Sequence, residues 1–318
     1  MVRRNRWVQT ARQVGIQIVR DDVAGLSAEL AYRFFLTIFP FFIFLTSLGN
    51  LLADAFSLPN PARHFADLLS QVMPPDAADV FQTEIRHVIG STRLGIATLS
   101  FAGAMLVATS GTNALIKAMN RAYGVEETRH FWRKYVLALT LTAYAGMAVI
   151  ASFVLFVKAW SVGFRVAVAA GQGNRFMDLV EIAYWPAVAA LITTALSVLY
   201  WAAPNIRNHF RWATPGAVLF MVSWMLTTAA FARYVERFGS YGLTYGTLAG
   251  VAVLLVWFYL TAFLLLIGVE LNAVLEEQRD PATIQAQRRK TRDEAAVRQL
   301  PPTAAGTMVE DQPTASSA

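Results

Sequence analysis

Charged and amide side chains stand beside long apolar segments in this sequence. Such groups are costly within a hydrocarbon layer and are therefore candidates for ligand binding. Arginine and lysine could bind an anionic group, while glutamate could hold those cations or exchange protons. The candidates for one polar, water-accessible vestibule are Glu29, Arg33, Asn113, Lys117, Asn205, Glu270 and Asn272.

The same residues have a simpler explanation, which the sequence leaves open. Each lies near the end of an apolar segment, where a side chain can reach water without serving a ligand. Glu29 and Arg33 also have the i,i+4 spacing of an ordinary helical ion pair, which contributes about 0.2–0.5 kcal/mol. These side chains therefore either line a ligand-binding vestibule or only stabilise the fold.

Motifs of enzyme chemistry are absent from the sequence. It has no H-E-x-x-H pair, no P-loop and no G-x-S-x-G motif, and it contains no cysteine. We therefore expect no catalytic site, no metal and no cofactor. The net charge of +6 comes from the basic segments between and beyond the apolar ones. We expect membrane lipids as partners and no nucleic acid.

Six apolar segments must position the candidate residues. Hydrophobic residues make up 56% of the chain and charged residues 15%, whereas soluble domains carry about 25% charged residues. A helix needs roughly 20 apolar residues to cross a bilayer. The segments of that length are 34–53, 96–116, 136–157, 182–203, 213–232 and 247–269. The sequence therefore predicts an all-α, polytopic integral membrane protein with six transmembrane helices.

Three parts of the chain follow from this pattern. Residues 1–33 form a cytoplasmic arm with an interfacial amphipathic helix over 10–32, residues 34–275 form the membrane domain, and residues 276–318 form a polar, disordered cytoplasmic tail. The apolar residues expected to lie on the membrane are Val14, Ile18, Ala24, Leu26 and Leu30.

The distribution of basic residues predicts the orientation. Of the 27 lysines and arginines, nineteen fall in the two terminal segments and in the second and fourth connections. Connections that stay in the cytoplasm carry the excess of these residues. Both termini are therefore expected in the cytoplasm.

Two features could supply conformational freedom. Pro40 lies seven residues into the first apolar segment, where proline kinks a helix, and the glycine-rich stretch before the sixth segment could act as a hinge or gate. The gate candidates are Gly239, Tyr241, Tyr245 and Gly246. Helix packing for Pro40 and a structural turn for the glycines are the alternatives.

Five stretches together resemble the YihY/BrkB family of bacterial inner-membrane proteins. They are "AGLSAELAYRFFLTIFPFFIF", "ALSVLYWAAPN", "TPGAVLF", "FGSYGLTYGTLAG" and "LLVWFYLTAFLLLIGVELNAVLE". The resemblance covers about residues 15–277. It implies a multi-pass protein of the inner (plasma) membrane with six helices. The family was formerly labelled ribonuclease BN, and a role in envelope-lipid transport has been suggested for it.

Three hypotheses about function follow. The first is a non-enzymatic transporter or flippase of an amphipathic, anionic envelope lipid or precursor, in which Arg33 and Lys117 offset the headgroup charge and Glu29 and Glu270 hold them or couple protons. The second is a non-transporting scaffold or regulator of envelope assembly. The third, a membrane-associated ribonuclease, lacks the clustered acids or histidines that hydrolysis needs.

Overall fold

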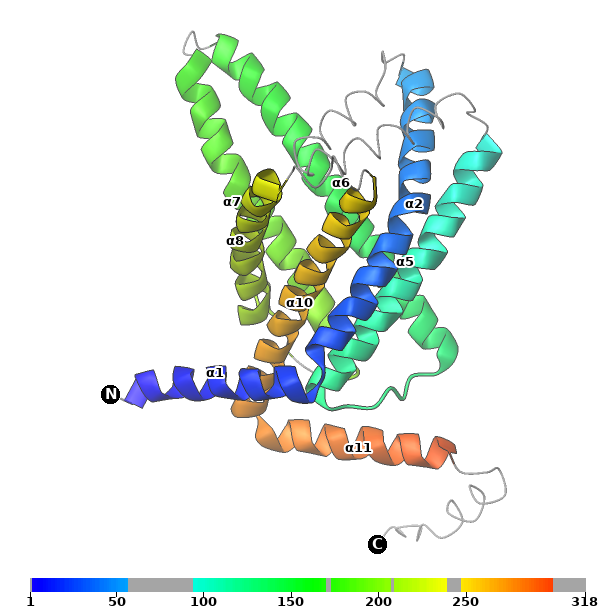
Figure 1. Cartoon of the computed structure of the whole chain (residues 1–318), viewed down its shortest axis with the longest axis vertical. Helices are drawn as coiled ribbons and strands as arrows, with labels where there is room; N and C mark the ends of the chain where they lie inside the picture. The colour runs from blue at the N-terminus through cyan, green and yellow to red at the C-terminus, as the bar shows by residue number, and fades with distance from the viewer. Residues whose placement is uncertain (1, 57–93, 170–172, 207–208, 239–246, 300–318) are drawn as a thin grey trace, which may run out of the picture.

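The computed structural model describes residues 2–56, 94–169, 173–206, 209–238 and 247–299, and within them the chain forms helices and no strand (Figure 1). The eight helices of the described residues are α1 (Val2–Arg20), α2 (Val23–Phe56), α5 (Leu94–Tyr123), α6 (Phe131–Ala169), α7 (Gly173–Ala202), α8 (Pro215–Phe238), α10 (Thr247–Arg279) and α11 (Pro281–Gln299).

Six of these helices form an elongated bundle, and the other two lie across one end of it. Helices α2, α5, α6, α7, α8 and α10 run along the long axis, while α1 and α11 cross that axis at the end near both termini (Figure 1). Helix α10 is central, because it packs against α2, α8, α5 and α1. Each predicted apolar segment falls almost entirely within one of the six long helices.

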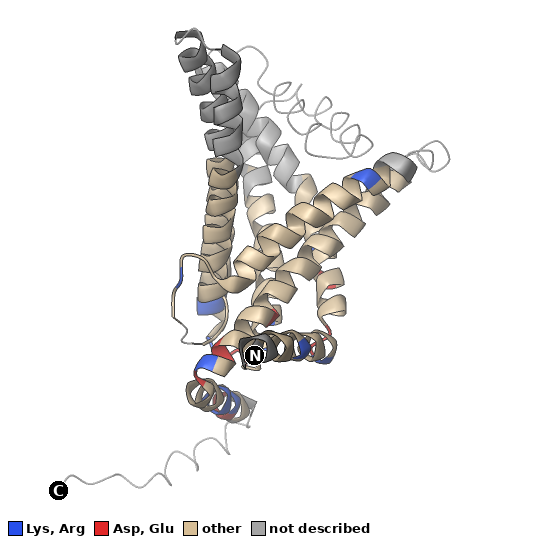
Figure 2. Ribbon diagram, turned by 90° about the vertical axis from the view of Figure 1, so that its left-hand side faces the viewer, with Lys and Arg blue, Asp and Glu red and all other residues tan. Residues whose placement is uncertain are grey.

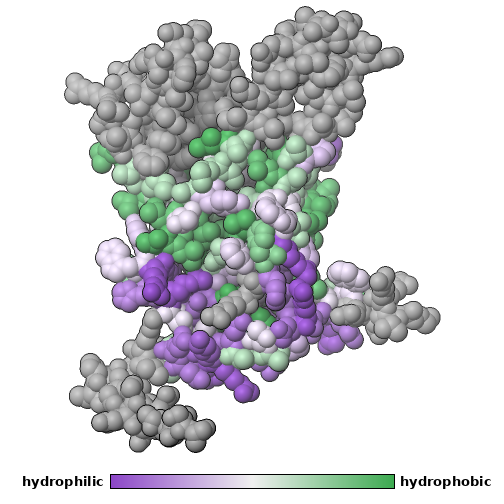
Figure 3. All heavy atoms as spheres, turned by 180° about the vertical axis from the view of Figure 1, so that it is seen from behind, coloured by the Kyte–Doolittle hydropathy of each residue, from purple (hydrophilic) through white to green (hydrophobic). Residues whose placement is uncertain are grey.

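The surface of the bundle is apolar where a membrane would contact it. Three described stretches are long and apolar enough to cross a bilayer, namely Phe131–Ser152, Pro215–Val235 and Ala249–Arg279, and Pro186–Ala202 is a shorter apolar helix. Large apolar side chains such as Leu106 and Leu226 are exposed. Figure 3 shows a hydrophobic band above a hydrophilic lower end. A soluble protein would bury these side chains.

Among the described residues, a buried apolar cluster lies toward the end that carries α1 and α11. There Leu30 of α2 meets Ile116 and Met119 of α5, and all three are essentially inaccessible to solvent. Helices α8 and α10 approach closely at Gly216 and Gly268, because a Cβ atom on Gly216 would overlap the main-chain oxygen of Gly268. Small residues permit such contacts between membrane helices.

The N-terminal arm differs from the prediction of one helix over 10–32. Helix α1 ends at Arg20, and Asp22 has a φ of 52°, in the left-handed region. Asp22 then caps α2, because its Oδ1 accepts a hydrogen bond from the Gly25 amide at 3.2 Å. Aspartate tolerates this backbone conformation and is a favoured N-cap.

The apolar residues of the arm also face differently from the prediction. Val14, Leu26 and Leu30 are buried within the protein, so they cannot lie on a membrane. Trp7 and Val19 of α1 are exposed instead. The interfacial position of α1 stays a prediction, and its crosswise direction at the end of the bundle agrees with it (Figure 1).

The prediction of a disordered tail from residue 276 is wrong for residues 281–299. Helix α11 starts with Pro281 at its first position, and Asp280 Oδ1 accepts a hydrogen bond from the Thr283 amide at 3.1 Å. Ile284 is buried against the rest of the protein. A favourable start and a few specific contacts therefore order a polar segment that its composition alone would leave unfolded. Residues 300–318 lie outside the described residues.

The hinge and gate candidates are described only in part. Pro40 lies within α2. Gly239, Tyr241, Tyr245 and Gly246 lie outside the described residues, as do residues 57–93 between the first and second apolar segments. The hinge therefore stays a prediction.

Candidate functional site

Among the residues that the structure describes, the charged positions gather at the end that carries α1 and α11 (Figure 2). All seven vestibule candidates belong to this half of the protein, but the structure distributes them over several places rather than one. Glu29, Arg33 and Lys117 come together. Asn205 and Asn272 belong to two separate hydrogen-bond networks. Glu270 is buried elsewhere, and Asn113 is half-buried on α5 one turn before Lys117.

The ion cluster joins α2 to α5 through one carboxylate and two cations. Arg33 Nη2 lies 2.9 Å from Glu29 Oε1, and Lys117 Nζ lies 3.5 Å from Glu29 Oε2. Arg33 also donates a hydrogen bond through Nη1 to Ser110 Oγ of α5. Sequence reasoning missed Ser110, because a serine within an apolar segment carries no distinguishing pattern.

The electrostatics of the cluster leave it with a net positive charge. Burial raises the pKa of Glu29, but the hydrogen bond from Arg33 and the charge of Lys117 outweigh burial and hold that pKa below its ordinary value. Glu29 is therefore ionised at neutral pH and balances only one of the two cations. The Lys117 side chain is 63% exposed, so its ammonium group can still bind an anion such as a phosphate.

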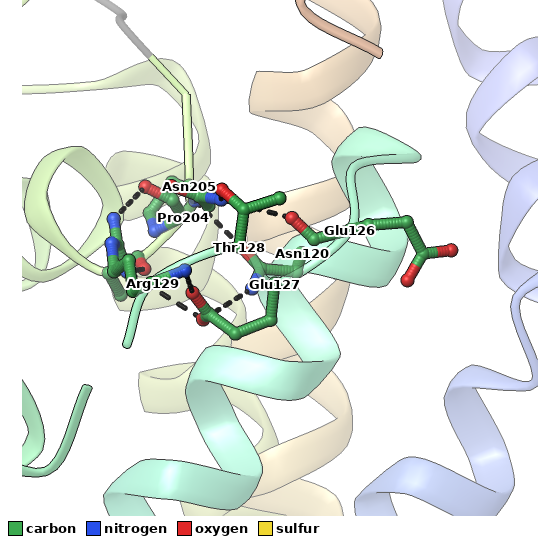
Figure 4. Close-up of polar contacts among 8 residues, drawn as sticks. Asn120, Glu126, Glu127, Thr128, Arg129, Pro204 and Asn205 are labelled. Atoms are coloured by element: carbon green, nitrogen blue, oxygen red, sulfur yellow. Dashed lines mark hydrogen bonds and ion pairs between the residues drawn. The ribbon is translucent and has the colours of Figure 1, made fainter. Parts of the chain in front are cut away.

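Asn205 fastens the end of α7 to the connection between α5 and α6 (Figure 4). Its main-chain nitrogen donates a hydrogen bond to Asn120 Oδ1 at 2.7 Å. Its side-chain Nδ2 donates to the Glu126 main-chain oxygen and to Thr128 Oγ1, both at 3.0 Å. Both hydrogens of Nδ2 have an acceptor in these contacts, which favours a structural role for Asn205.

Arg129 completes the same network. Its guanidinium donates to the main-chain oxygens of Ala203 and Pro204 at 2.9 and 2.8 Å (Figure 4). Burial lowers the pKa of Arg129, and Glu127, 3.9 Å away, opposes that effect. In the sequence, Arg129 is only one of the basic residues of the second connection that indicate the orientation. Its contact with the carbonyls at the end of α7 could not be foreseen, because the two segments are far apart in the sequence.

Asn272 fixes the start of α8 against α10. Its Oδ1 accepts a hydrogen bond from the Gly216 amide at 2.8 Å, and its Nδ2 donates to Thr214 Oγ1 at 3.2 Å. The Thr214 amide in turn donates to Ser197 Oγ of α7 at 3.0 Å. The Asn272 side chain therefore satisfies an amide that a helix start leaves without a partner, so its position favours structure over ligand binding.

Glu270 differs from the other candidates because it is buried and incompletely paired. Its exposed fraction is 2%, and Oε2 has no hydrogen-bond partner among the described residues. The charged groups that act on it are Asp21, Arg20 and Arg121.

A cleft of about 410 Å³ lies between α1 and the end of α10. Its lining residues are Gln9, Arg12, Gln13, Ile16 and Gln278. None of the seven vestibule candidates lines it. Within the part of the chain that the structure describes, no group of three or more acids or histidines is placed to bind a metal ion.

Comparison with known proteins identifies the family. The family model described as Virulence factor BrkB matches residues 16–294. The chain belongs to the BrkB virulence factor family. The predicted resemblance is thus confirmed, and the protein is a membrane protein of a bacterial family with several apolar helices.

Relatives with curated names cover most of this BrkB family member. It is 29% identical over 253 residues to the "Putative ribonuclease-like protein YfkH" of Bacillus subtilis, a match that covers 80% of this chain and 90% of that protein. It is 28% identical over 265 residues to a "UPF0761 membrane protein" of Alteromonas mediterranea, covering 81% and 84% of the two chains. A "UPF0761 membrane protein" of Vibrio vulnificus is 27% identical over 281 residues, covering 84% of each chain. No solved structure matches the chain.

Proposed function

We propose that this protein is a non-enzymatic transporter of an amphipathic, anionic envelope lipid or lipid precursor in the bacterial inner membrane. The observation that carries the proposal is the cluster of Glu29, Arg33 and Lys117, in which two cations share one carboxylate. The helices that carry it, α2 and α5, also expose apolar side chains such as Leu36 and Leu106. A headgroup that carries phosphate would contact the exposed Lys117 ammonium, while its acyl chains lie along the apolar bundle. The site thus offers a cation for the anionic headgroup and an apolar surface for the acyl chains.

The proposal includes six membrane crossings with both termini in the cytoplasm. Each of the six long helices contains one of the predicted apolar segments. Among the described residues, the charged positions gather at the end with α1 and α11 (Figure 2), and basic residues favour the cytoplasmic side. The cluster would therefore meet lipids of the inner leaflet.

Neutralising the cluster tests the proposal. Purified protein is reconstituted in liposomes that contain a fluorescent phosphatidylglycerol, and transbilayer movement is followed by chemical quenching of the outer leaflet, with and without ion gradients. We expect movement with the unaltered protein and a loss of about tenfold with Lys117→Gln, which corresponds to about 1.4 kcal/mol of lost binding. Arg133→Gln, an exposed arginine at the start of α6, is the matched control and should retain the rate.

A second candidate function is a scaffold or regulator of envelope assembly that moves no lipid. The observation that favours it is the use of Asn205 and Asn272 in structural hydrogen bonds rather than in one cavity. The same liposome assay separates the two functions. A protein that folds and inserts correctly but moves no anionic lipid under any gradient contradicts the transporter and favours the scaffold.

A further inference from the structure

Glu270 of α10 is a buried carboxyl group with an unpaired oxygen. Its exposed fraction is only 2%, and Oε2 meets no hydrogen-bond donor among the described residues. An ionised carboxylate in such a place is costly, because it has lost water without gaining a partner. Proton uptake removes the charge and turns the carboxyl group into a hydrogen-bond donor.

Helix α1 packs against α10 through one of its faces. Thr10, Val14, Gln17 and Asp21 follow one another at intervals of four, three and four residues, so they share this face. Thr10 Oγ1 donates to Gln278 Oε1 of α10 at 3.2 Å, and Val14 and Asp21 are buried. The contact between α1 and α10 therefore runs from Thr10 to the junction with α2.

A second unpaired acceptor belongs to that same face of α1. Gln17 Oε1 is buried and has no hydrogen-bond partner among the described residues. The two helices that pack here thus contribute one unpaired acceptor each, from Gln17 and from Glu270. A proton on Glu270 would turn one of these two unpaired acceptors into a donor.

The charged groups near Glu270 leave its carboxyl group without an ion pair. Asp21 carries a like charge, while Arg20 and Arg121 are the opposite charges that act on Glu270. Arg20 is already paired with Asp21 at 3.2 Å, and its side chain is 59% exposed. No ion pair to Glu270 forms among the described residues, so neither arginine neutralises it directly.

Among the described residues of α2, α8 and α11, which also pack on α10, no lysine or arginine pairs with Glu270. On α2 the first charged residue is Glu29, which already pairs with Arg33 and Lys117. Helix α8 has no charged residue before Arg233. At the far end of α10, Glu277 is paired with Arg288 of α11.

We propose that Glu270 is a proton-binding site that controls the docking of α1 on the bundle. Neutral Glu270 favours the docked helix, and ionised Glu270 favours its release. The site is separate from the Glu29, Arg33 and Lys117 cluster, so the inference does not depend on lipid transport.

The absence of cysteine from the chain gives a direct test. Val14→Cys places one thiol on the buried face of α1. Val8→Cys places one at an exposed position of α1 that does not line the cleft against α10, and this thiol is the reference for intrinsic reactivity. Maleimide labelling rates of the full-length protein in detergent are compared between about pH 5.5 and pH 8. The ratio of the buried-face rate to the reference rate should rise with pH, by up to about tenfold per pH unit where docking is linked to one proton.

Glu270→Gln should abolish this rise, because the amide cannot ionise, and the thiol of the Val14→Cys variant should then stay as protected at high pH as at low pH. Glu294→Gln on α11 is the control and should leave the rise unchanged. A rise that persists in the Glu270→Gln protein, or a ratio independent of pH with Glu270 present, overturns the proposal. If Glu270→Gln fails to fold, Asp21→Asn decides instead: removal of the like charge should reduce the rise, and an undiminished rise contradicts the proposal.

Discussion

Arg288 of α11 donates a hydrogen bond through Nε to the main-chain oxygen of Tyr123, the last residue of α5, at 2.7 Å. Its two terminal nitrogens donate to the Glu277 carboxylate at 2.8 and 3.1 Å. Gly124 makes room for this side chain, because its φ is 65° and a Cβ there would lie 3.0 Å from Arg288 Nε. One arginine therefore fastens the C-terminal helix to the ends of α5 and α10.

Replacing Arg288 by alanine should release α11. The change removes charge-assisted hydrogen bonds, which contribute about 1.5–3 kcal/mol each when a partner is charged. Amide hydrogen exchange of residues 281–299 should accelerate by about tenfold or more, while exchange in α5 changes little. Arg292→Ala, an exposed residue on the same helix, is the control, and equal acceleration in both variants would contradict the role of Arg288.

Gly216→Ala should disrupt the contact between α8 and α10. The new methyl group would overlap the Gly268 main-chain oxygen and lie 2.7 Å from Asn272 Nδ2, and neither helix backbone can move without losing the Asn272 bonds. Overpacking of this kind costs about 1–3 kcal/mol. Thermal unfolding in detergent measures it. Gly146→Ala is the control, because no atom lies within 4 Å of the added Cβ, and it should be neutral or stabilising.

Asn205→Ala should loosen the connection between α5 and α6. It removes two hydrogen bonds from Nδ2 and leaves the Glu126 oxygen and Thr128 without that donor. We expect a loss of about 1–3 kcal/mol and faster proteolysis within residues 124–130. Asn113→Ala is the matched control, since its half-buried side chain makes no hydrogen bond to a described residue. Equal sensitivity of the two variants would argue against the Asn205 network.

The pairing of Glu29 should stabilise the protein at neutral pH and not in acid. The pKa of Glu29 in the folded protein lies below its ordinary value of 4.5, so the stabilisation is complete above that ordinary value and is lost as the pH falls through the folded value. The melting temperature should therefore fall less in acid for Glu29→Gln than for the unaltered protein. Because the Glu29 side chain is 32% exposed, the difference should be small and should shrink in high salt.

Much of the architecture could be predicted from the sequence because the bilayer imposes strong rules. A long apolar segment must become a helix in lipid, and the six predicted segments do lie in six long helices. The i,i+4 spacing of Glu29 and Arg33 likewise predicted their ion pair, which the structure confirms at 2.9 Å. Both predictions rest on local spacing, which a sequence displays directly.

What could not be predicted depends on contacts between distant segments. The sequence grouped Asn205 and Asn272 with the charged residues, since nothing local shows that an amide will meet Thr128 or Gly216. The break at Asp22 was missed because the apolar pattern continues across it. Helix α11 was missed because its composition is polar and its docking depends on Arg288 and the α5 terminus.

The most direct test of the proposed function is the headgroup preference of lipid movement. The rates for a fluorescent phosphatidylglycerol and a fluorescent phosphatidylcholine are compared in the same proteoliposomes, for the unaltered protein and for Lys117→Glu. If the cluster of Glu29, Arg33 and Lys117 receives the anionic headgroup, the unaltered protein moves phosphatidylglycerol faster, and the charge reversal removes that preference. A preference that survives Lys117→Glu, or no protein-dependent movement of either lipid, would contradict the proposal.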